Sequence, residues 1–373
     1  MLMADRGAGS QLWPMDYRLL SIFFALAFGC GSSGSTAGGD DGGDLGDAGV
    51  AFDATVPEGD AGIGTDAGED PDLGGAALAR YDLDAVHPEG GTFDVAADRF
   101  FVGSLGDGSV HAIDATTGEE TVFFEETEPG TWWSLGMDID ETKGTLVVCA
   151  MDDRRVPDDV DPPYEGWVWE LDLESGERVA RHRLGDAFDT ATCTDVAVLD
   201  DGTIYVVDRE HPNVYRIPPD GDPELFVTDD ELSASAIGLN AVVSLPDESA
   251  LLAVLYLPSR MVRIALPDGA VSEVDIDGDF LNATPPLSGA DGMTWSGDDL
   301  LVQFTGELAR VRPITADWST AASVTIDVPA QQTDIVHTPH GDYMLNGQAR
   351  EFAFDQDTEP FALVRVDTSR FDD

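Results

Sequence analysis

Six repeats of short apolar segments occupy residues 81–373, and this periodicity constrains the fold more than any other feature of the sequence. Each repeat opens with a segment of similar pattern, at intervals of 42 to 59 residues. Asp-Gly and Pro turns separate the apolar runs, and no long run has the 3.6-residue period of an amphipathic helix. The pattern therefore predicts an all-β domain. The opening segments begin at Glu89, Leu135, Thr194, Asn240, Asp291 and Thr333.

Further strands follow the opening segment within each repeat. Second strands are expected at 99–102, 145–148, 203–206, 251–254, 300–302 and 343–345. Third strands are expected at 109–114, 167–172, 213–217, 261–266, 307–311 and 363–367, and five repeats add a fourth, for example at 121–124 and 225–228. Four strands in a repeat of about 40 to 60 residues are typical of a β-propeller blade. We therefore expect a six-bladed β-propeller.

The ring of blades is expected to close through the N-terminal part of the domain. The sixth repeat has no fourth strand before Asp373, whereas residues 78–84 form a segment with no other partner. Pairing of this segment with the sixth repeat removes an open sheet edge. We predict a single domain over residues 77–373, with four strands in each blade.

Residues 1–76 have the composition of a targeting segment followed by a linker. The apolar stretch 19–29 follows Arg18 and is too short to span a bilayer at about 1.5 Å per residue, as expected of a signal peptide. It ends at Cys30 in a sequence that resembles a bacterial lipobox, so residues 1–30 are predicted to be a signal peptide with lipidation at Cys30; an ordinary secretory signal is the alternative. The Gly- and Asp-rich residues 31–76 are expected to form a disordered linker. Gly31 favours export to the outer membrane.

The charge balance excludes several classes of partner. The chain has 73 acidic and 19 basic residues, which give a net charge of −54. Such a chain cannot neutralise phosphates, so we expect no nucleic-acid partner and no docking on anionic lipid through a basic patch. Membrane contact is expected only through the lipid at Cys30, and we expect the protein to be a monomer.

The folded domain itself is strongly acidic, and Lys143 is the only lysine in the chain. Because salt screens the repulsion among surface carboxylates, we hypothesise adaptation to a saline environment. An acidic secreted protein without salt dependence is the alternative. We predict that the thermal unfolding midpoint rises as sodium chloride is increased from low to molar concentration. A midpoint that stays constant or falls contradicts the hypothesis.

Two cysteines are expected to lie close together in the propeller. Cys149 ends a predicted second strand, and Cys193 precedes the opening strand of the next blade. Both residues then lie at the same face of neighbouring blades. Because export implies an oxidising compartment, a disulfide between them is one interpretation, and two buried thiols are the other.

The first residues of the innermost strands are expected to converge on the central channel. Glu89, Asn240 and Asp291 then offer oxygen atoms from three blades, and hard divalent cations prefer such ligands. Two carboxylates near one axis repel each other unless a cation or a proton lies between them. Capping of turns by these side chains is the alternative interpretation.

These residues stand in the motifs Pro88-Glu89-Gly90, Asn240-Ala241 and Ala290-Asp291-Gly292-Met293. The motifs resemble those of the senescence marker protein/gluconolactonase family of regucalcin-like six-bladed propellers, and the resemblance extends over the predicted propeller. It implies that Glu89, Asn240 and Asp291 hold a divalent metal, with calcium favoured over zinc, and that Asp291 acts as general base. Such a site hydrolyses small-molecule lactones or esters.

The sequence departs from the family pattern in the third blade. Thr194 and Asp195 stand where the family has Asn-Asp-Gly; we expect them beside the metal or substrate, with His87 as a nearby proton shuttle. No arginine precedes Thr194 where the family has one that binds substrate. Two functions therefore remain open. One is an exported, lipid-anchored, metal-dependent lactonase or esterase, and the other is a non-catalytic, surface-displayed propeller that serves as a binding or scaffold module.

Overall fold

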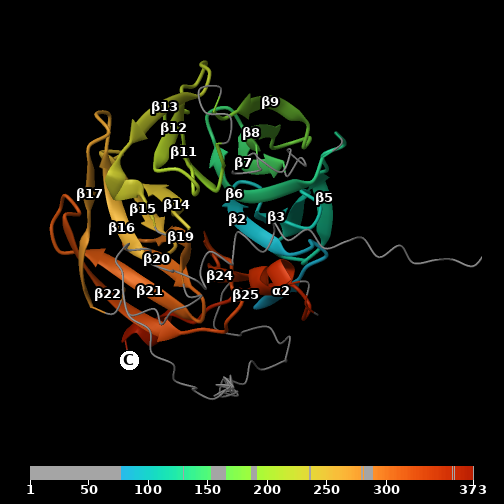
Figure 1. The fold of residues 1–373 in the computed structure, drawn as a ribbon. Coiled ribbons are helices and arrows are strands. Elements are labelled where there is room, and N and C mark those ends of the chain that lie inside the picture. Colours follow the sequence, from blue (N-terminus) through green and yellow to red (C-terminus); the bar gives the residue numbers. More distant parts are fainter. Residues whose placement is uncertain are drawn as a thin grey trace, which may run out of the picture.

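The computed structural model describes residues 77–372 except 129, 153–164, 186–190, 235–236, 279, 281–288, 355 and 357. The predicted signal peptide, the linker and Cys30 lie outside the described residues. Six sheets surround a central channel, and the chain visits them in order around the ring (Figure 1). The fold is the six-bladed β-propeller that the repeats predict. No helix among the described residues has the length and apolar character needed to cross a membrane.

The innermost strand of each blade lines the channel, and the later strands follow outward. Blades one and two consist of β2 (Pro88–Asp94), β3 (Arg99–Ser104), β4 (Val110–Asp114), β5 (Glu120–Phe124), β6 (Trp132–Asp140), β7 (Thr145–Asp152), β8 (Glu165–Asp172) and β9 (Arg178–Arg183). Blades three and four consist of β10 (Asp195–Val198), β11 (Ile204–Val207), β12 (Asn213–Ile217), β13 (Glu224–Thr228), β14 (Leu239–Ser244), β15 (Ala250–Leu255), β16 (Arg260–Ala265) and β17 (Val271–Glu273).

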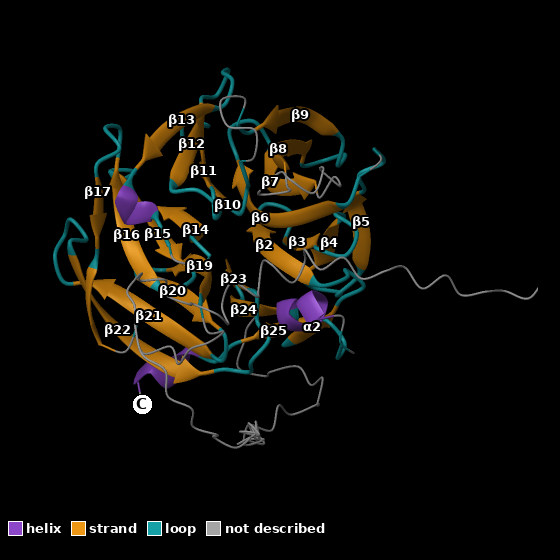
Figure 2. Cartoon of the chain, viewed as in Figure 1, coloured by secondary structure: helices purple, strands orange, loops and turns teal. Residues whose placement is uncertain are grey.

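The remaining two blades contain the late strands and the first strand of the domain. Blade five consists of β18 (Asp275–Gly278), β19 (Ala290–Ser296), β20 (Asp299–Phe304), β21 (Glu307–Pro313) and β22 (Thr320–Asp327). Blade six consists of β23 (Asp334–Thr338), β24 (Gly341–Asn346), β25 (Ala362–Arg365) and β1 (Arg80–Asp82). Two short helices lie in connections between strands, namely η1 (Asp230–Leu232) and α2 (Ala349–Phe354), and a third, η2 (Thr368–Asp372), follows the last strand (Figure 2).

Strand β1 closes the ring, as predicted, although it is shorter than the segment 78–84. It pairs antiparallel with β25, with Tyr81 opposite Leu363. The Tyr81 side chain is 2% exposed, and its hydroxyl donates a hydrogen bond of 2.7 Å to the Ala115 carbonyl oxygen of blade one. The strand therefore completes blade six and fastens it to blade one.

Blade five differs from the prediction because it has a fifth strand. β18 pairs in parallel with β22, with Asp275 opposite Thr320 and Gly278 opposite Ser323. Only Val274 separates β17, the outer strand of blade four, from β18. One extended segment thus forms the outer strand of blade four and then adds an outer strand to blade five. Since outer strands of successive blades run in the same direction, the added pair is parallel.

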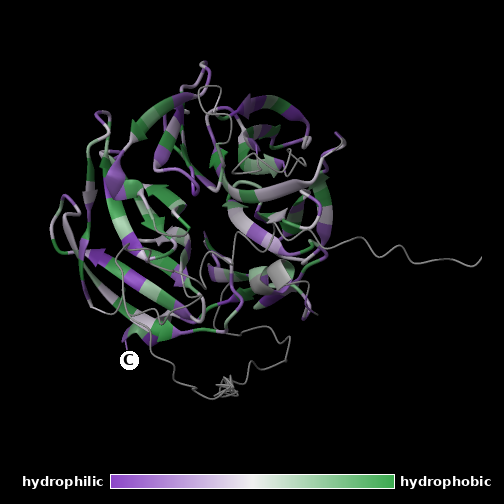
Figure 3. Ribbon diagram, viewed as in Figure 1, coloured by the Kyte–Doolittle hydropathy of each residue, from purple (hydrophilic) through white to green (hydrophobic). Residues whose placement is uncertain are grey.

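Strongly apolar residues recur along the strands of all six blades (Figure 3), and many of them are buried. Phe124 of blade one contacts Trp169 of blade two, with ring centroids 5.1 Å apart. Between blades four and five, Val254 packs in one buried cluster with Met293 and Phe304. This packing fixes each blade relative to the next and therefore sets the geometry of the channel.

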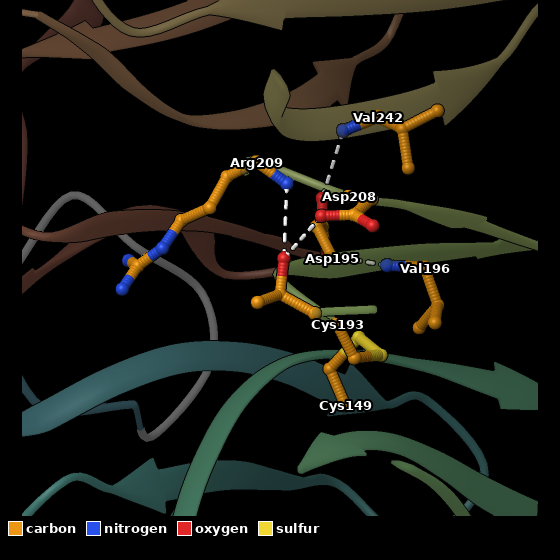
Figure 4. The surroundings of a disulfide bond; sticks show 8 residues. Cys149, Cys193, Asp195, Val196, Asp208, Arg209 and Val242 are labelled. Carbon is orange, nitrogen blue, oxygen red and sulfur yellow. Dashed lines mark hydrogen bonds between the residues drawn. A yellow bond between two sulfur atoms is a disulfide. The ribbon is translucent and has the colours of Figure 1, made fainter. Parts of the chain in front are cut away.

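A disulfide joins Cys149 of β7 to Cys193, which lies just before β10 (Figure 4). Their Cα atoms are 5.2 Å apart, and both residues are fully buried. The bond therefore links blade two to blade three beside the channel. The sequence left this pairing open against two buried thiols.

Gly90 follows the predicted metal ligand Glu89 and has a φ of +69°, a backbone conformation that favours glycine. A Cβ atom at this position would lie 2.2 Å from the Leu135 carbonyl oxygen of blade two. We predict that Gly90→Ala lowers the free energy of unfolding by more than about 2 kcal/mol, measured by urea denaturation. Gly297→Ala is the matched control because Gly297 has a φ of +61° with open space around it. Equal losses in the two variants would refute the steric explanation.

Candidate functional site

Irregular strand starts position the three predicted metal ligands. The pairing of β2 with β3 shifts between Pro88 and Gly91, that of β14 with β15 between Leu239 and Ala241, and that of β19 with β20 between Ala290 and Met293. The residues within these shifts include Glu89, Asn240 and Asp291. A bulge turns a side chain away from the regular alternation of a strand. The three residues thus occupy equivalent irregular positions in blades one, four and five.

Two cavities meet at these residues. The larger cavity, of about 290 Å³, lies within the channel, and the smaller one has about 70 Å³. Glu89, Asn240, Asp291 and Thr333 line both cavities. The structure therefore brings the three predicted ligands together, at the junction between the channel and a second pocket.

A hydrogen bond between blades orients Asp291. The Asn240 Nδ2 atom donates to Asp291 Oδ1 over 2.5 Å. The Asn240 side-chain oxygen accepts no hydrogen bond within the described residues, so it can serve as a ligand. Because this hydrogen bond engages Asp291 Oδ1, the second carboxylate oxygen, Oδ2, is the one available to accept a proton.

The carboxylates at the junction favour the protonated form when no cation is present. Burial, followed by the negative charge of Asp334, raises the pKa of Asp291 from 3.8 to about 8. The Asn240 hydrogen bond and the positive charge of Arg209 oppose this increase. Burial raises the pKa of Glu89 well above 4.5, and the charges of Asp291 and Asp334 raise it further. A divalent cation would reverse both shifts.

Two further aspartates in the wall of the larger cavity, Asp334 and Asp195, accept hydrogen bonds from neighbouring blades. Asp334 of blade six accepts a hydrogen bond of 2.8 Å from the Gly91 amide of blade one. Asp195 of blade three accepts one of 2.8 Å from the Val242 amide of blade four (Figure 4). Burial raises the pKa of Asp334 to about 7 and that of Asp195 well above 3.8. A Cβ atom at Gly292 would lie 2.0 Å from Asp334 Oδ1, so the glycine makes room for this carboxylate.

Thr194 lies in the wall of the channel cavity, as does Asp195. Its side chain is 2% exposed, and its Oγ1 atom has no hydrogen-bond partner within the described residues. A buried hydroxyl without a partner is costly, and a cation or its water can satisfy it. The oxygen donors of Glu89, Asn240, Asp291 and Thr194 therefore fit a hard divalent cation.

The ligand set contains only two carboxylates. Among the described residues, no group of three or more His, Cys, Asp or Glu side chains is arranged to hold a metal. The candidate site therefore relies on the Asn240 amide beside Glu89 and Asp291, with the Thr194 hydroxyl in the wall of the same channel cavity.

The structure does not bring His87 into the site. This residue lines neither cavity, and its ring makes tilted contacts with Phe352 and Phe361 at centroid distances of 5.0 and 4.9 Å. Its Nδ1 atom lies 3.2 Å from the Gly347 carbonyl oxygen. The sequence position of His87 beside Pro88 suggested a proton shuttle. In the structure its imidazole packs against these two phenylalanines.

Arg209 and Tyr256 line the smaller cavity and were not among the site residues predicted from the sequence. Each follows the end of a second strand, β11 or β15. The Thr192 hydroxyl accepts a hydrogen bond of 3.2 Å from the Arg209 backbone amide, and the Arg209 side chain extends away from the disulfide (Figure 4). Second strands end at the face where innermost strands begin. A search of these strand ends would therefore have found both residues.

The raised pKa values predict that alkaline pH destabilises the metal-free protein. A group whose pKa is higher in the folded state stabilises that state fully below its unfolded pKa and loses this effect as pH rises through the folded value. For Asp334 and Asp291 the window runs from about 4, their ordinary value, to about 7 and 8. With excess chelator, the free energy of unfolding should fall by a few kcal/mol between pH 4.5 and 8.5. A constant or rising value would contradict the burial of these carboxylates.

Comparison with known proteins supports the fold. The sequence matches no family model and no curated protein. Among solved structures, the major allergen Mala s 1 of Malassezia sympodialis is similar, with a TM-score of 0.65, 15% identity and coverage of 78% of this chain and 96% of the allergen. A gluconolactonase from Xanthomonas campestris has a TM-score of 0.54 and 17% identity, over 78% of this chain and 89% of the enzyme. Regucalcin from Agrobacterium tumefaciens, a calcium-binding protein, has a TM-score of 0.52 and 16% identity, over 77% and 93%.

Proposed function

We propose that the protein is a metal-dependent lactone or ester hydrolase whose site lies at the junction of the two cavities. One observation carries this proposal: strand irregularities in three blades direct two carboxylates and an amide to the same place, where both carboxylates have raised pKa values. Groups with strongly shifted pKa values in a cavity are candidates for function. The gluconolactonase and the calcium-binding regucalcin among the structural neighbours add support for this class of activity.

In this proposal Glu89, Asn240 and Asp291 hold the cation, and Thr194 adds a hydroxyl. When bound, a divalent cation supplies a Lewis acid that polarises the carbonyl group and stabilises developing negative charge. Calcium fits better than zinc, since the four residues common to both cavities include neither His nor Cys. Asp291 accepts the proton of the attacking water at Oδ2, because the Asn240 amide occupies Oδ1 and fixes the carboxylate.

The proposal extends to the location of the protein. We propose that the chain is exported, lipidated at Cys30 and held at the outer membrane as a monomer, with the linker 31–76 between lipid and propeller. The disulfide between Cys149 and Cys193 supports export, because such bonds persist in oxidising compartments. Metabolic labelling with a palmitate analogue tests the anchor, with Cys30→Ser as the control. Labelling that is absent, or that persists in the variant, argues against it.

The activity can be tested with a substrate panel. The purified protein is treated with chelator, reconstituted with calcium or zinc, and assayed against lactones and aryl esters. We expect hydrolysis that requires metal and that is stronger with calcium. Hydrolysis that is unaffected by chelator would contradict the proposed mechanism. Tight calcium binding without any hydrolysis would instead favour a binding or scaffold module.

A further inference from the structure

The smaller cavity combines an apolar wall with one cationic side chain. Its wall consists largely of aliphatic and aromatic residues: Leu105, Trp133, Leu135, Ile237 and Phe352. Phe352 belongs to α2 and contacts Trp133, with ring centroids 6.0 Å apart. Among the described residues of this wall, Arg209 is the one basic side chain. A pocket of this composition binds a ligand with a short apolar portion and a polar anchor.

Arg209 is held in place but keeps its guanidinium available. Its backbone is fixed on both sides, since its amide donates to Thr192 and its carbonyl oxygen accepts from Gly238 over 2.9 Å. The side chain is 13% exposed, and its Nε atom lies 3.5 Å from Glu210 Oε1. The terminal nitrogen atoms form no hydrogen bond within the described part of the chain.

Arg209 shares its cavity with the groups that form the proposed site. Glu89, Asp291 and Tyr256 line the smaller cavity together with this arginine. With a divalent cation bound, the charges of Glu89 and Asp291 are balanced, and Arg209 supplies the basic side chain in the wall of the smaller cavity. A planar guanidinium pairs well with a carboxylate through two parallel hydrogen bonds.

We propose that the site takes carboxylate-bearing ligands with a short aliphatic portion, and that Arg209 binds the carboxylate. The identity of the reacting group rests on the proposed function. If the protein is a hydrolase, the substrate is an anionic lactone or ester whose carbonyl lies at the junction of Glu89, Asn240 and Asp291. The apolar portion lies against Trp133 and Phe352. A neutral polyhydroxylated lactone suits this wall poorly, because apolar side chains cannot replace the hydrogen bonds of its hydroxyl groups with water.

A binding experiment tests the ligand class without relying on turnover. Isothermal titration of the calcium-loaded protein compares butanoate with butanamide, which differ in charge but little in shape. We expect the carboxylate to bind at least tenfold more tightly, and we expect Arg209→Gln to remove most of this difference and Arg209→Lys to retain part of it. Arg216→Gln is the matched control, since Arg216 is a partly exposed arginine paired with Glu224 on the outer side of blade three.

Equal binding of the two probes, or a preference that Arg209→Gln leaves intact, overturns the inference. A kinetic arm separates it from the proposed function. The kinetic comparison uses a hydrolysed lactone that carries a carboxylate and the neutral methyl ester of that carboxylate. The kcat/KM for the anionic lactone divided by the kcat/KM for the neutral one should be at least tenfold lower in Arg209→Gln than in the wild-type protein. Hydrolysis without charge preference refutes the assignment of carboxylate ligands and is compatible with the proposed hydrolase activity. Arg209-dependent binding without hydrolysis of any lactone or ester refutes the proposed hydrolase activity and is compatible with the ligand assignment.

Discussion

Replacing Asp291 with asparagine is expected to lower hydrolysis by about 10³-fold or more, because the variant loses both a charged ligand and the group that accepts the proton of water. Asparagine preserves the shape of the side chain, so the blades should stay in place. The measurement is kcat/KM for the best substrate of the panel, with saturating calcium in both proteins. Asp247→Asn serves as the control, since Asp247 lies in an exposed turn and bonds to Ser249.

The same substitution should have the opposite effect on the stability of the metal-free protein. Asp291 is held in a place that raises its pKa to about 8, so its ionised form destabilises the fold at alkaline pH. Asp291→Asn removes this charge, and the unfolding midpoint at pH 8.5 in chelator should rise. An inactive variant that is also less stable would indicate structural damage. Full activity in Asp291→Asn would exclude Asp291 as the base.

Loss of the Cys149–Cys193 disulfide is expected to produce the largest change in stability. The two residues are 44 apart in the sequence, and closing a loop of this length removes about 4 kcal/mol of chain entropy from the unfolded state. Both residues are fully buried between blades two and three, so their environment cannot easily relax. The double variant Cys149→Ser, Cys193→Ser should therefore unfold at a markedly lower urea concentration.

Reduction provides an independent check of that effect. Dithiothreitol should lower the urea midpoint of the wild-type protein toward that of the double variant and should leave the variant unchanged. Identical midpoints for oxidised and reduced wild-type protein would show that the bond does not stabilise the fold. A reductant effect of equal size in the double variant would trace the change to another cause.

Much of the architecture could be predicted because the repeat is a local property of the sequence. The six opening segments and the strands that follow them lie where the pattern indicated. The segment around Tyr81 pairs with the outer edge of blade six, as predicted. The extra strand β18 was missed because Asp275–Gly278 has a single apolar residue, Ile276, which is too few to indicate a strand. Its pairing depends on the neighbouring edge of β22, which the local sequence does not reveal.

Site residues on the innermost strands could be predicted by aligning the repeats, whereas site residues in the connections could not. Glu89, Asn240 and Asp291 start equivalent strands, so alignment of the repeats was sufficient to bring them together. Arg209 reaches the same place from a connection, through hydrogen bonds of its backbone to Thr192 and Gly238. His87 shows the converse, since a neighbour of Glu89 in sequence turns toward Phe352 and Phe361.

Calcium titration of the chelator-treated protein tests the central claim, that Glu89, Asn240 and Asp291 hold a divalent cation. Isothermal titration at pH 7 in buffers of different ionisation enthalpy gives both the stoichiometry and the number of protons released. We predict one calcium ion per chain and the release of about one proton or more, because a pKa of about 8 leaves Asp291 mostly protonated at this pH in the metal-free state, and burial also raises the pKa of Glu89. Asp291→Asn should abolish both signals. Calcium binding without proton release, binding that Asp291→Asn leaves intact, or no binding at all would contradict the claim.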